Sequence, residues 1–158
     1  MSKDFDFEYA PAPESRAIVS IENKYGLFID GKFTTPQSKK YLDTLNPATE
    51  DKLSEVALAG AKDVDLAVKA ARKAHQKTWS KLSGQERGKY LFRIARLMQE
   101  RAREFAVLET LDNGKPIRES RDVDIPLAVA HFFYHAGWAD KLEYVGRSEE
   151  HTSELQSQ

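Results

Sequence analysis

The last helical pattern in the chain, from Asp124 to Tyr144, is apolar around much of its circumference. Proline is tolerated only in the first turn of a helix, so Pro126 predicts that this helix begins near Asp124, with that aspartate as its N-cap. Its apolar residues do not fit one stripe: Leu127, Val129, Ala130, Phe132, Phe133, Tyr134, Ala136 and Trp138. A helix that is apolar on most sides needs cover on most sides. The pattern therefore requires a fold with several elements packed around this helix.

Two further helices are predicted upstream, and each has a single apolar stripe. In the first, the stripe is Val64, Ala67, Val68 and Ala71, with Asp63 and Asp65 in the first turn. The second begins with a capping box of Ser83 and Glu86 and ends at Asn113-Gly114. Its stripe is Leu91, Ala95, Met98, Ala102 and Phe105. Unbroken, it would span about 29 residues, or roughly 43 Å.

The residues before the first helix predict two short antiparallel strand pairs. In "GLFIDGKFT", Asp30-Gly31 separates two apolar runs, which favours a tight hairpin because glycine accepts the positive φ of a type I′ turn. A second pair is predicted at Tyr41–Leu45 and Leu53–Leu58, joined through a turn at Pro47. The chain is thus expected to be mainly α-helical. Its few elements cannot cover the last helix on every side, which indicates a piece of a larger protein.

Composition excludes several classes of function. The chain of 158 residues has no cysteine, so it holds no disulfide, no thiolate metal site and no cysteine nucleophile. Its 24 Lys and Arg against 25 Asp and Glu give a net charge of -1, which favours neither nucleic acid nor an anionic membrane as a partner. No stretch approaches the roughly 18 apolar residues of a membrane span. We expect a soluble, cytoplasmic protein.

The residues that could carry chemistry do not assemble into an active site. His131 and His135 share a helix face, but no third metal ligand accompanies them, so packing or hydrogen bonding is the favoured interpretation. "SGQERGKY" resembles a phosphate-binding loop only in part, because Tyr90 stands where Ser or Thr would hold magnesium, and it is better explained as a helix N-terminus. Asp122 and Asp124 are interpreted as capping residues.

Several stretches together resemble one family. "GLFIDGKF", "NPATE", "VDLAVKAARKA", "SGQERGKYLFRIARLM", "LETLDNGKPIRESRDVDIPLAV" and "FYHAGWADK" are similar to the N-terminal part of NAD(P)-dependent aldehyde dehydrogenases, in the order and at the spacing of that family. The resemblance covers roughly residues 25–144. It implies an α/β parent enzyme with a Rossmann-like cofactor domain, of which this chain would be the opening portion.

The resemblance also implies a function for the parent and a division of the chain. The parent would oxidise aldehydes to carboxylic acids with NAD or NADP, and would be a homo-oligomer. The nucleophilic Cys, the general-base Glu and the oxyanion Asn of the family lie beyond the residues present here, so this chain is expected to be inactive and to bind no cofactor itself. Residues 1–20 would be an N-terminal extension, residues 21–145 the incomplete cofactor domain, and residues 146–158 a non-native, disordered tail.

Two sets of residues match positions that have a known role in the family, one at the substrate tunnel and one at a cation site. Leu127 and His131 match residues at the mouth of the substrate tunnel, although a core role is equally compatible with each. A stretch whose backbone oxygens hold a structural monovalent cation in some members is matched by Thr44, Leu45 and Asp112, and for Asp112 the alternative is that it only precedes a helix stop.

The C-terminal run "RSEEHTSELQS", residues 147–157, resembles something different. It agrees codon by codon with the translation of a widely used sequencing adapter, which favours a non-native tail over an ordinary solvated terminus. An alternative from a different class of function stays open at this point. The chain would then be a short helical module that binds or regulates other proteins without catalysis.

Overall fold

The computed structural model describes residues 14–142 and 144–145, so the expectations for residues 1–13 and for the tail from residue 146 lie outside the described residues. The strands are β1 (Lys24–Tyr25), β2 (Leu27–Ile29), β3 (Lys32–Thr34), β4 (Tyr41–Leu45) and β5 (Lys52–Ala57). The helices are η1 (Arg16–Ile18), α1 (Ala61–Lys77), η2 (Trp79–Lys81), α2 (Gly84–Glu100), α3 (Ala102–Asn113), α4 (Ile117–Glu119), η3 (Ser120–Asp124) and α5 (Ile125–Trp138). The expected mainly helical fold with strand pairs near the N-terminus is confirmed.

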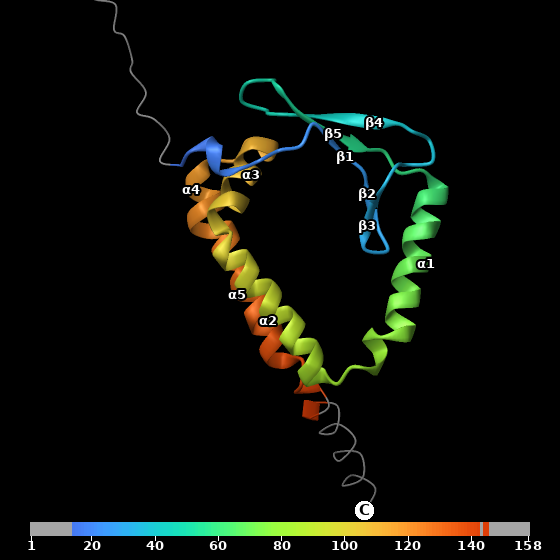
Figure 1. Cartoon of the computed structure of the whole chain (residues 1–158). Helices are drawn as coiled ribbons and strands as arrows, with labels where there is room; N and C mark the ends of the chain where they lie inside the picture. The colour runs from blue at the N-terminus through green and yellow to red at the C-terminus, as the bar shows by residue number, and fades with distance from the viewer. Residues whose placement is uncertain (1–13, 143, 146–158) are drawn as a thin grey trace, which may run out of the picture.

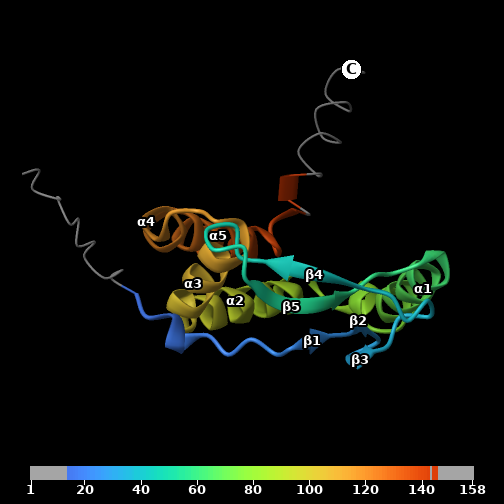
Figure 2. The same ribbon diagram turned by 90° about the horizontal axis from the view of Figure 1, so that it is seen from above.

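The described chain has two helical parts, which the strands join at one end and the segment with η2 joins at the other. Helices α2 and α5 run side by side, whereas α1 stands apart from them at the other end of the small sheets (Figure 1). The view from above shows the same separation (Figure 2). No helix within the described ranges is long and apolar enough to cross a membrane.

Both predicted strand pairs are confirmed. Strands β2 and β3 pair antiparallel, and the turn between them has φ of 53° at Asp30 and 79° at Gly31, as a type I′ turn requires. Strands β4 and β5 also pair antiparallel. The two-residue strand β1, which is too short to leave a sequence signal, pairs parallel with β5 and completes a three-stranded sheet in the order β1-β5-β4.

The long second helix is not unbroken. Arg101 leaves the helical conformation, with φ of -107° and ψ of 20°, and separates α2 from α3. In a straight helix, Val107 and Leu111 would point more than about 100° away from Ala95. The change of direction at Arg101 lets all three side chains become buried. The predicted stop is confirmed, because α3 ends at Asn113 and Gly114 has the left-handed φ of 74°.

The prediction that Asp124 caps a new helix is wrong. Helical backbone continues from α4 through η3 into α5, and Asp124 itself is helical and makes no capping hydrogen bond. Its carboxylate instead accepts a hydrogen bond of 2.6 Å from Lys115 Nζ. The expected cap at Asp122 is also wrong, since that carboxylate pairs with the neighbouring Arg121.

The missing N–H of proline explains this continuous passage. Pro126 lies in the first turn of α5, as expected, and cannot donate to the carbonyl four residues before it. The backbone widens there, and Ile125 N–H donates to Ser120 O, five residues back. A wide turn of this π type absorbs the proline without ending the helix.

The α2–α5 contact is close because glycines lie at its centre. A Cβ atom at Gly88 would stand 2.9 Å from Ala136 O, and one at Gly84 would overlap Ala139 O. Farther along the pair, the rings of Phe92 and Phe133 meet edge to face at 4.8 Å. The buried apolar residues gather around this contact and the adjoining α3: Ala95, Ala106, Val107, Leu111, Ile125 and Val129.

The N-terminal segment is tied to α3 rather than loose from residue 14 onward. The side chain of Glu14 is only 9% exposed and forms ion pairs with Arg103 at 2.6 Å and with Arg121 at 3.7 Å. Ser15 then caps η1 by accepting a hydrogen bond from Ala17 N–H. The start of the described chain is therefore held against both α3 and η3.

Gly88→Ala should destabilise the chain, even though alanine is the better helix former. The added Cβ would push α2 and α5 apart at a cost of about 1–3 kcal/mol, against a propensity gain of about 0.5–1 kcal/mol. Gly137→Ala is the matched control, because a Cβ at Gly137 would meet no atom within 4 Å. Urea denaturation followed by circular dichroism should show opposite signs for the two variants, and equal stabilisation by both would contradict the close contact.

Candidate functional site

The strongest candidate for a substrate-facing surface is the side of α5 that points away from α2. Leu127 and His131 lie one turn apart on this side and are both exposed, Leu127 at 51%. Tyr134 and Trp138 continue the same side, with their rings 6.2 Å apart. The structure therefore brings the two predicted residues together with two aromatic residues that the prediction did not include. The spacing of Tyr134 and Trp138 from Leu127, seven and eleven residues, was the signal that could have found them.

The geometry of this face is set by the opposite side of α5. Ala136 and Val129 are turned toward α2 and the core, and Val129 is buried. Since a helix has about 3.6 residues per turn, residues 127, 131, 134 and 138 must then point outward. The ring of Tyr134 also meets the ring of His135 edge to face at 5.3 Å, so the outward surface is aromatic along one side. Such a surface suits apolar or aromatic groups.

The described residues contain no group of three or more His, Cys, Asp or Glu side chains that could hold a metal ion. The spacing of His131 and His135 therefore has no third ligand beside it in this part of the chain. Near the expected cation position, the turn after β4 approaches the end of α3. Pro47 packs against Gly114, and a Cβ atom added at Gly114 would lie 3.1 Å from the Cβ of Pro47. That contact involves side-chain packing and identifies no cation ligand.

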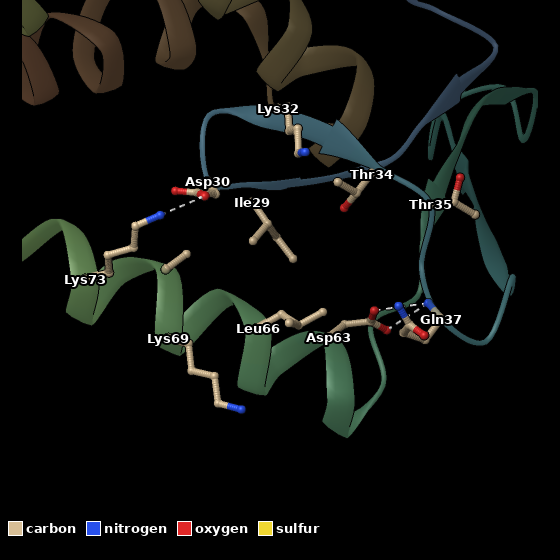
Figure 3. A pocket seen from close by; sticks show the side chains of 11 residues that line it. Ile29, Asp30, Lys32, Thr34, Thr35, Gln37, Asp63, Leu66, Lys69 and Lys73 are labelled. Carbon is tan, nitrogen blue, oxygen red and sulfur yellow. Dashed lines mark hydrogen bonds and ion pairs between the residues drawn. The ribbon is translucent and has the colours of Figure 1, made fainter.

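A second candidate is a cleft of about 390 Å³ between the β2–β3 hairpin and α1. Ile29 and Leu66 face each other across it, and an ion pair of 3.5 Å joins Lys73 to Asp30 at one end (Figure 3). Lys69 points away from the hairpin in the same view, so the lysines of α1 do not converge on a common anion. The centre of the cleft is therefore apolar, and the charges of Lys73 and Asp30 at its edge are paired with each other.

The covered face of α1 differs from the stripe expected from the sequence. Of the expected stripe, Ala67 and Ala71 border the hairpin, together with Leu66 and Ala70. Val64 and Val68 do not line the clefts beside the hairpin and are 51% and 50% exposed, and Leu66 is itself 47% exposed. The reason is Asp63, which is buried and fixes the start of the helix. Its carboxylate accepts hydrogen bonds from Gly60 N–H at 2.9 Å and from Gln37 N–H at 3.0 Å. The sequence placed Asp63 in the first turn but gave no sign of its bond to the segment after β3.

Carboxylates occupy the N-termini of α1 and α2, where a dinucleotide phosphate could otherwise bind. A phosphate site of that kind uses free N–H groups at the start of a helix that follows a strand. Helix α1 follows β5, yet the Asp63 carboxylate already occupies that end. At α2, Glu86 accepts hydrogen bonds from Ser83 N–H at 2.8 Å and from Ser83 Oγ at 2.9 Å. These bonds lower the pKa of Glu86, so it stays ionised and would repel an incoming anion.

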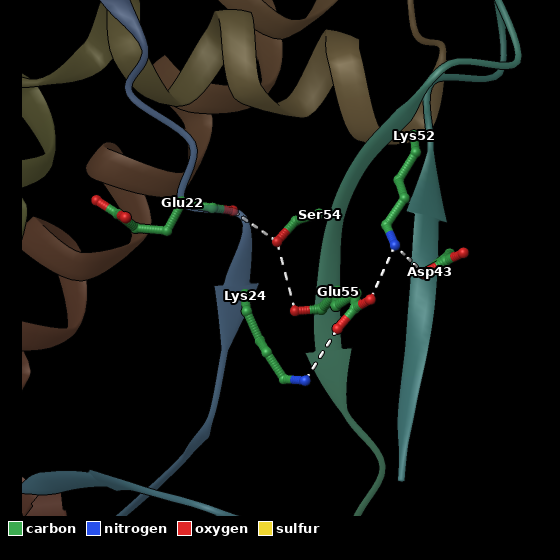
Figure 4. Close-up of polar contacts among 6 residues, drawn as sticks. All are labelled: Glu22, Lys24, Asp43, Lys52, Ser54 and Glu55. Atoms are coloured by element: carbon green, nitrogen blue, oxygen red, sulfur yellow. Dashed lines mark hydrogen bonds and ion pairs between the residues drawn. The ribbon is translucent and has the colours of Figure 1, made fainter.

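A network of four charged side chains lies on the three-stranded sheet. Glu55 of β5 receives Lys24 from β1 and Lys52 from its own strand, each at 3.0 Å, and Lys52 also reaches Asp43 of β4 at 2.7 Å (Figure 4). The hydrogen bonds from Lys52 and Lys24 lower the pKa of Glu55. This network joins the three strands across the sheet. It involves no residue of the α5 face.

Asp63→Ala should destabilise the chain by about 2–3 kcal/mol, because it leaves the N–H groups of Gly60 and Gln37 without an acceptor. Asp63→Asn keeps an acceptor oxygen and should cost less. Asp65→Ala is the control: Asp65 lies in the same turn, is exposed and should change stability by only about 0.3–0.5 kcal/mol. The free energy of unfolding from urea titration is the measurement, and equal effects at the two positions would contradict the buried role of Asp63.

Glu55 makes stability depend on pH in a defined direction. Its folded pKa lies below the unfolded value of about 4.3, so its contribution is present above that pH and is lost as the pH falls through the folded pKa. The stability difference between wild type and Glu55→Gln should therefore be largest near neutral pH. It should shrink in acid and in high salt, because the pairs are exposed. A difference that grows on acidification would contradict this sign.

Comparison with known proteins assigns the family. The sequence profile of the aldehyde dehydrogenase family matches residues 33–157, and the chain belongs to this family. It is 50% identical over 117 residues to the DhaS protein of Bacillus subtilis, a match that covers 73% of this chain and 24% of that protein. To aldehyde dehydrogenase B of Escherichia coli it is 42% identical over 118 residues, covering 75% of this chain and 23% of the relative.

Solved structures agree with this assignment. An aldehyde dehydrogenase from Bacillus cereus, solved as its NAD+ complex, superposes with a TM-score of 0.72 at 41% identity, covering 75% of this chain and 24% of that one. An NAD-dependent aldehyde dehydrogenase from Sinorhizobium meliloti gives a TM-score of 0.74 at 32% identity, with coverage of 85% and 27%. The chain thus spans about a quarter of the length of the relatives it matches, and the expected Rossmann-like α/β class is that of these neighbours.

Proposed function

We propose that residues 21–145 form the opening portion of the cofactor-binding domain of an NAD(P)-dependent aldehyde dehydrogenase subunit, whose complete form oxidises aldehydes to carboxylic acids. The observation that carries this proposal is the match of one continuous stretch, residues 33–157, to the family, together with the superposition on an aldehyde dehydrogenase solved with NAD+. The complete subunit would be a cytoplasmic homo-oligomer. This portion has near-equal numbers of acidic and basic residues, so it would offer no nucleic-acid partner a basic surface.

Within that enzyme, this chain would supply surface rather than reacting groups. It has no cysteine, so the thiolate that attacks the aldehyde carbonyl must come from another part of the subunit. NAD(P) would accept the hydride, and it would be held by other segments, because both helix N-termini described above are closed by carboxylates. The chain on its own is therefore inactive.

The outward face of α5 would guide the aldehyde toward the reacting groups. Leu127 offers an exposed apolar side chain that would lie against the carbon chain of the substrate, and His131 offers a ring nitrogen that can donate or accept a hydrogen bond one turn away. Contacts of this kind act on the substrate before the chemical step. They are expected to affect KM more than kcat.

A chimeric enzyme tests the proposed function. Residues 21–145 replace the matching segment of Escherichia coli aldehyde dehydrogenase B, and aldehyde-dependent formation of NADH or NADPH is followed by absorbance. We expect activity from the chimera and none from the isolated chain. Aldehyde oxidation by the isolated chain, or a folded chimera without activity, would contradict the proposal.

The same chimera examines the α5 face. Leu127→Ala removes about three methylene-sized groups from the surface next to the substrate and should raise KM for a long aliphatic aldehyde by about 10-fold or more, with little change in kcat. Val64→Ala is a suitable control, because Val64 is equally exposed at 51% but lies in α1, apart from α5. Equal effects of the two substitutions would remove the basis for a substrate-facing role of Leu127.

A further inference from the structure

The cleft between the β2–β3 hairpin and α1 has an apolar centre that remains partly open. Its volume of about 390 Å³ lies within the range of about 300–1,000 Å³ that is typical of small-molecule sites. Ile29 and Leu66 face each other across it (Figure 3), and Ala70 lines it beside them. Leu66 is nevertheless 47% exposed. The hairpin and the helix therefore leave aliphatic surface that a ligand can cover.

The two carboxylates that line this cleft are already engaged. At one end, Asp63 accepts hydrogen bonds from the N–H groups of Gly60 and Gln37. At the other end, Asp30 forms its ion pair of 3.5 Å with Lys73. These ends are roughly 15 Å apart, because ten residues of α1 separate them at a rise of about 1.5 Å each. Neither carboxylate is free to hold a cationic ligand.

A lysine without a partner lies at the same end of the cleft as the ion pair. Lys32 of β3 is the cross-strand neighbour of Ile29, so both side chains lie on the face of the hairpin that borders α1. Within the described ranges, Lys32 has no ion-pair partner. Lys32 and Lys73 against Asp30 leave one positive charge at this end. An anion is therefore attracted to this end and repelled from the end that holds Asp63.

We propose that this cleft binds a medium-chain fatty acid, with its carboxylate at Lys32 and its chain between Ile29 and Leu66. One unpaired lysine suits a monoanion, whereas a phosphate carries more charge and is usually held by several donors. Among the described residues that line the cleft, none is aromatic, so the apolar part of the ligand would be aliphatic. The site lies apart from the α5 face, and the inference does not depend on the proposed function.

The chain and the carboxylate of the ligand make separate contributions to binding. A methylene group that is fully buried strengthens binding by about fourfold, and one in an open cleft by about twofold. The contribution of Lys32 is smaller than that of a buried charge, because its side chain is exposed to water. A ligand that has only one of the two groups should therefore bind more weakly than a fatty acid.

Titration of the full chain with sodium octanoate, followed by the NMR chemical shifts of its backbone amides, tests the proposal. Octanoate is kept below the concentration at which it forms micelles. Hexanoate shortens the chain, octanol removes the charge, and acetate removes the chain. We expect saturable shifts at residues 29, 32 and 66 with octanoate. Hexanoate should bind about fourfold more weakly and octanol about threefold or more, and acetate should cause no saturable shift at the same concentration.

Three substitutions assign the two contributions to residues. Lys32→Met removes the charge and keeps an unbranched apolar side chain, so it should raise the Kd for octanoate by about threefold to fivefold and leave the Kd for octanol unchanged. Lys69→Met is the matched control, because Lys69 lines the cleft but points away from the hairpin (Figure 3). Leu66→Ser should raise the Kd for both ligands by about fivefold. The amide spectra also show whether each variant keeps its fold.

Three results would overturn the proposal: no saturable shift at the cleft, equal affinity for octanoate and octanol, or equal weakening by Lys32→Met and Lys69→Met. A fourth concerns the opposite face of the hairpin, where Phe28 and Phe33 are exposed by 65% and 66%. Shifts of equal size at these phenylalanines would show that octanoate covers any apolar surface of the chain, and the cleft would then not be a specific site.

Discussion

The close approach of α2 and α5 is the constraint on which the rest of the structure depends. Positions 84 and 88 of α2 are glycines, so no side chain there holds α2 away from the backbone at Ala136 and Ala139. With backbones this near, the rings of Phe92 and Phe133 meet edge to face between the two helices, and the buried residues of α3 pack at the end of the pair. The orientation of α5 then decides which side chains face outward, including Leu127 and His131. The two glycines thus determine, through the α2–α5 contact, which surface of α5 is proposed to contact the substrate.

Two carboxylates give the helical parts their fixed starting points. Asp63 closes α1 and holds the segment after β3, and Glu86 closes α2 through Ser83. Both use N–H groups that a dinucleotide phosphate would need, so local stability and cofactor binding exclude each other at these positions. This agrees with the proposal that the chain contributes packing surfaces and that the reacting groups would come from other segments of a complete subunit.

Local patterns in the sequence predicted local structure well. The hairpin at Asp30-Gly31, the capping box at Ser83 and the stop at Gly114 all depend on residues close in sequence, and all are confirmed. The failures concern contacts between distant residues. Gly84 and Gly88 were interpreted only as part of a helix start, because the need for a small residue comes from α5, 48 or more residues later. Asp124 resembled a cap, but Lys115 and the wide turn before Pro126 determine its role.

At the candidate site, too, the local structure could be predicted from the sequence, whereas the contacts between distant residues could not. The spacing of Leu127 and His131 correctly placed both residues on one side of a helix, but which side faces outward depends on α2. Amide hydrogen exchange of the isolated chain tests most directly whether the α2–α5 contact organises the fold. We predict the slowest exchange in α2, α3 and α5 around Ala95, Ala106 and Val129, and much faster exchange in α1, where Val64, Leu66 and Val68 are exposed. Exchange in α1 as slow as in α2, or uniformly fast exchange in all four helices, would contradict the account.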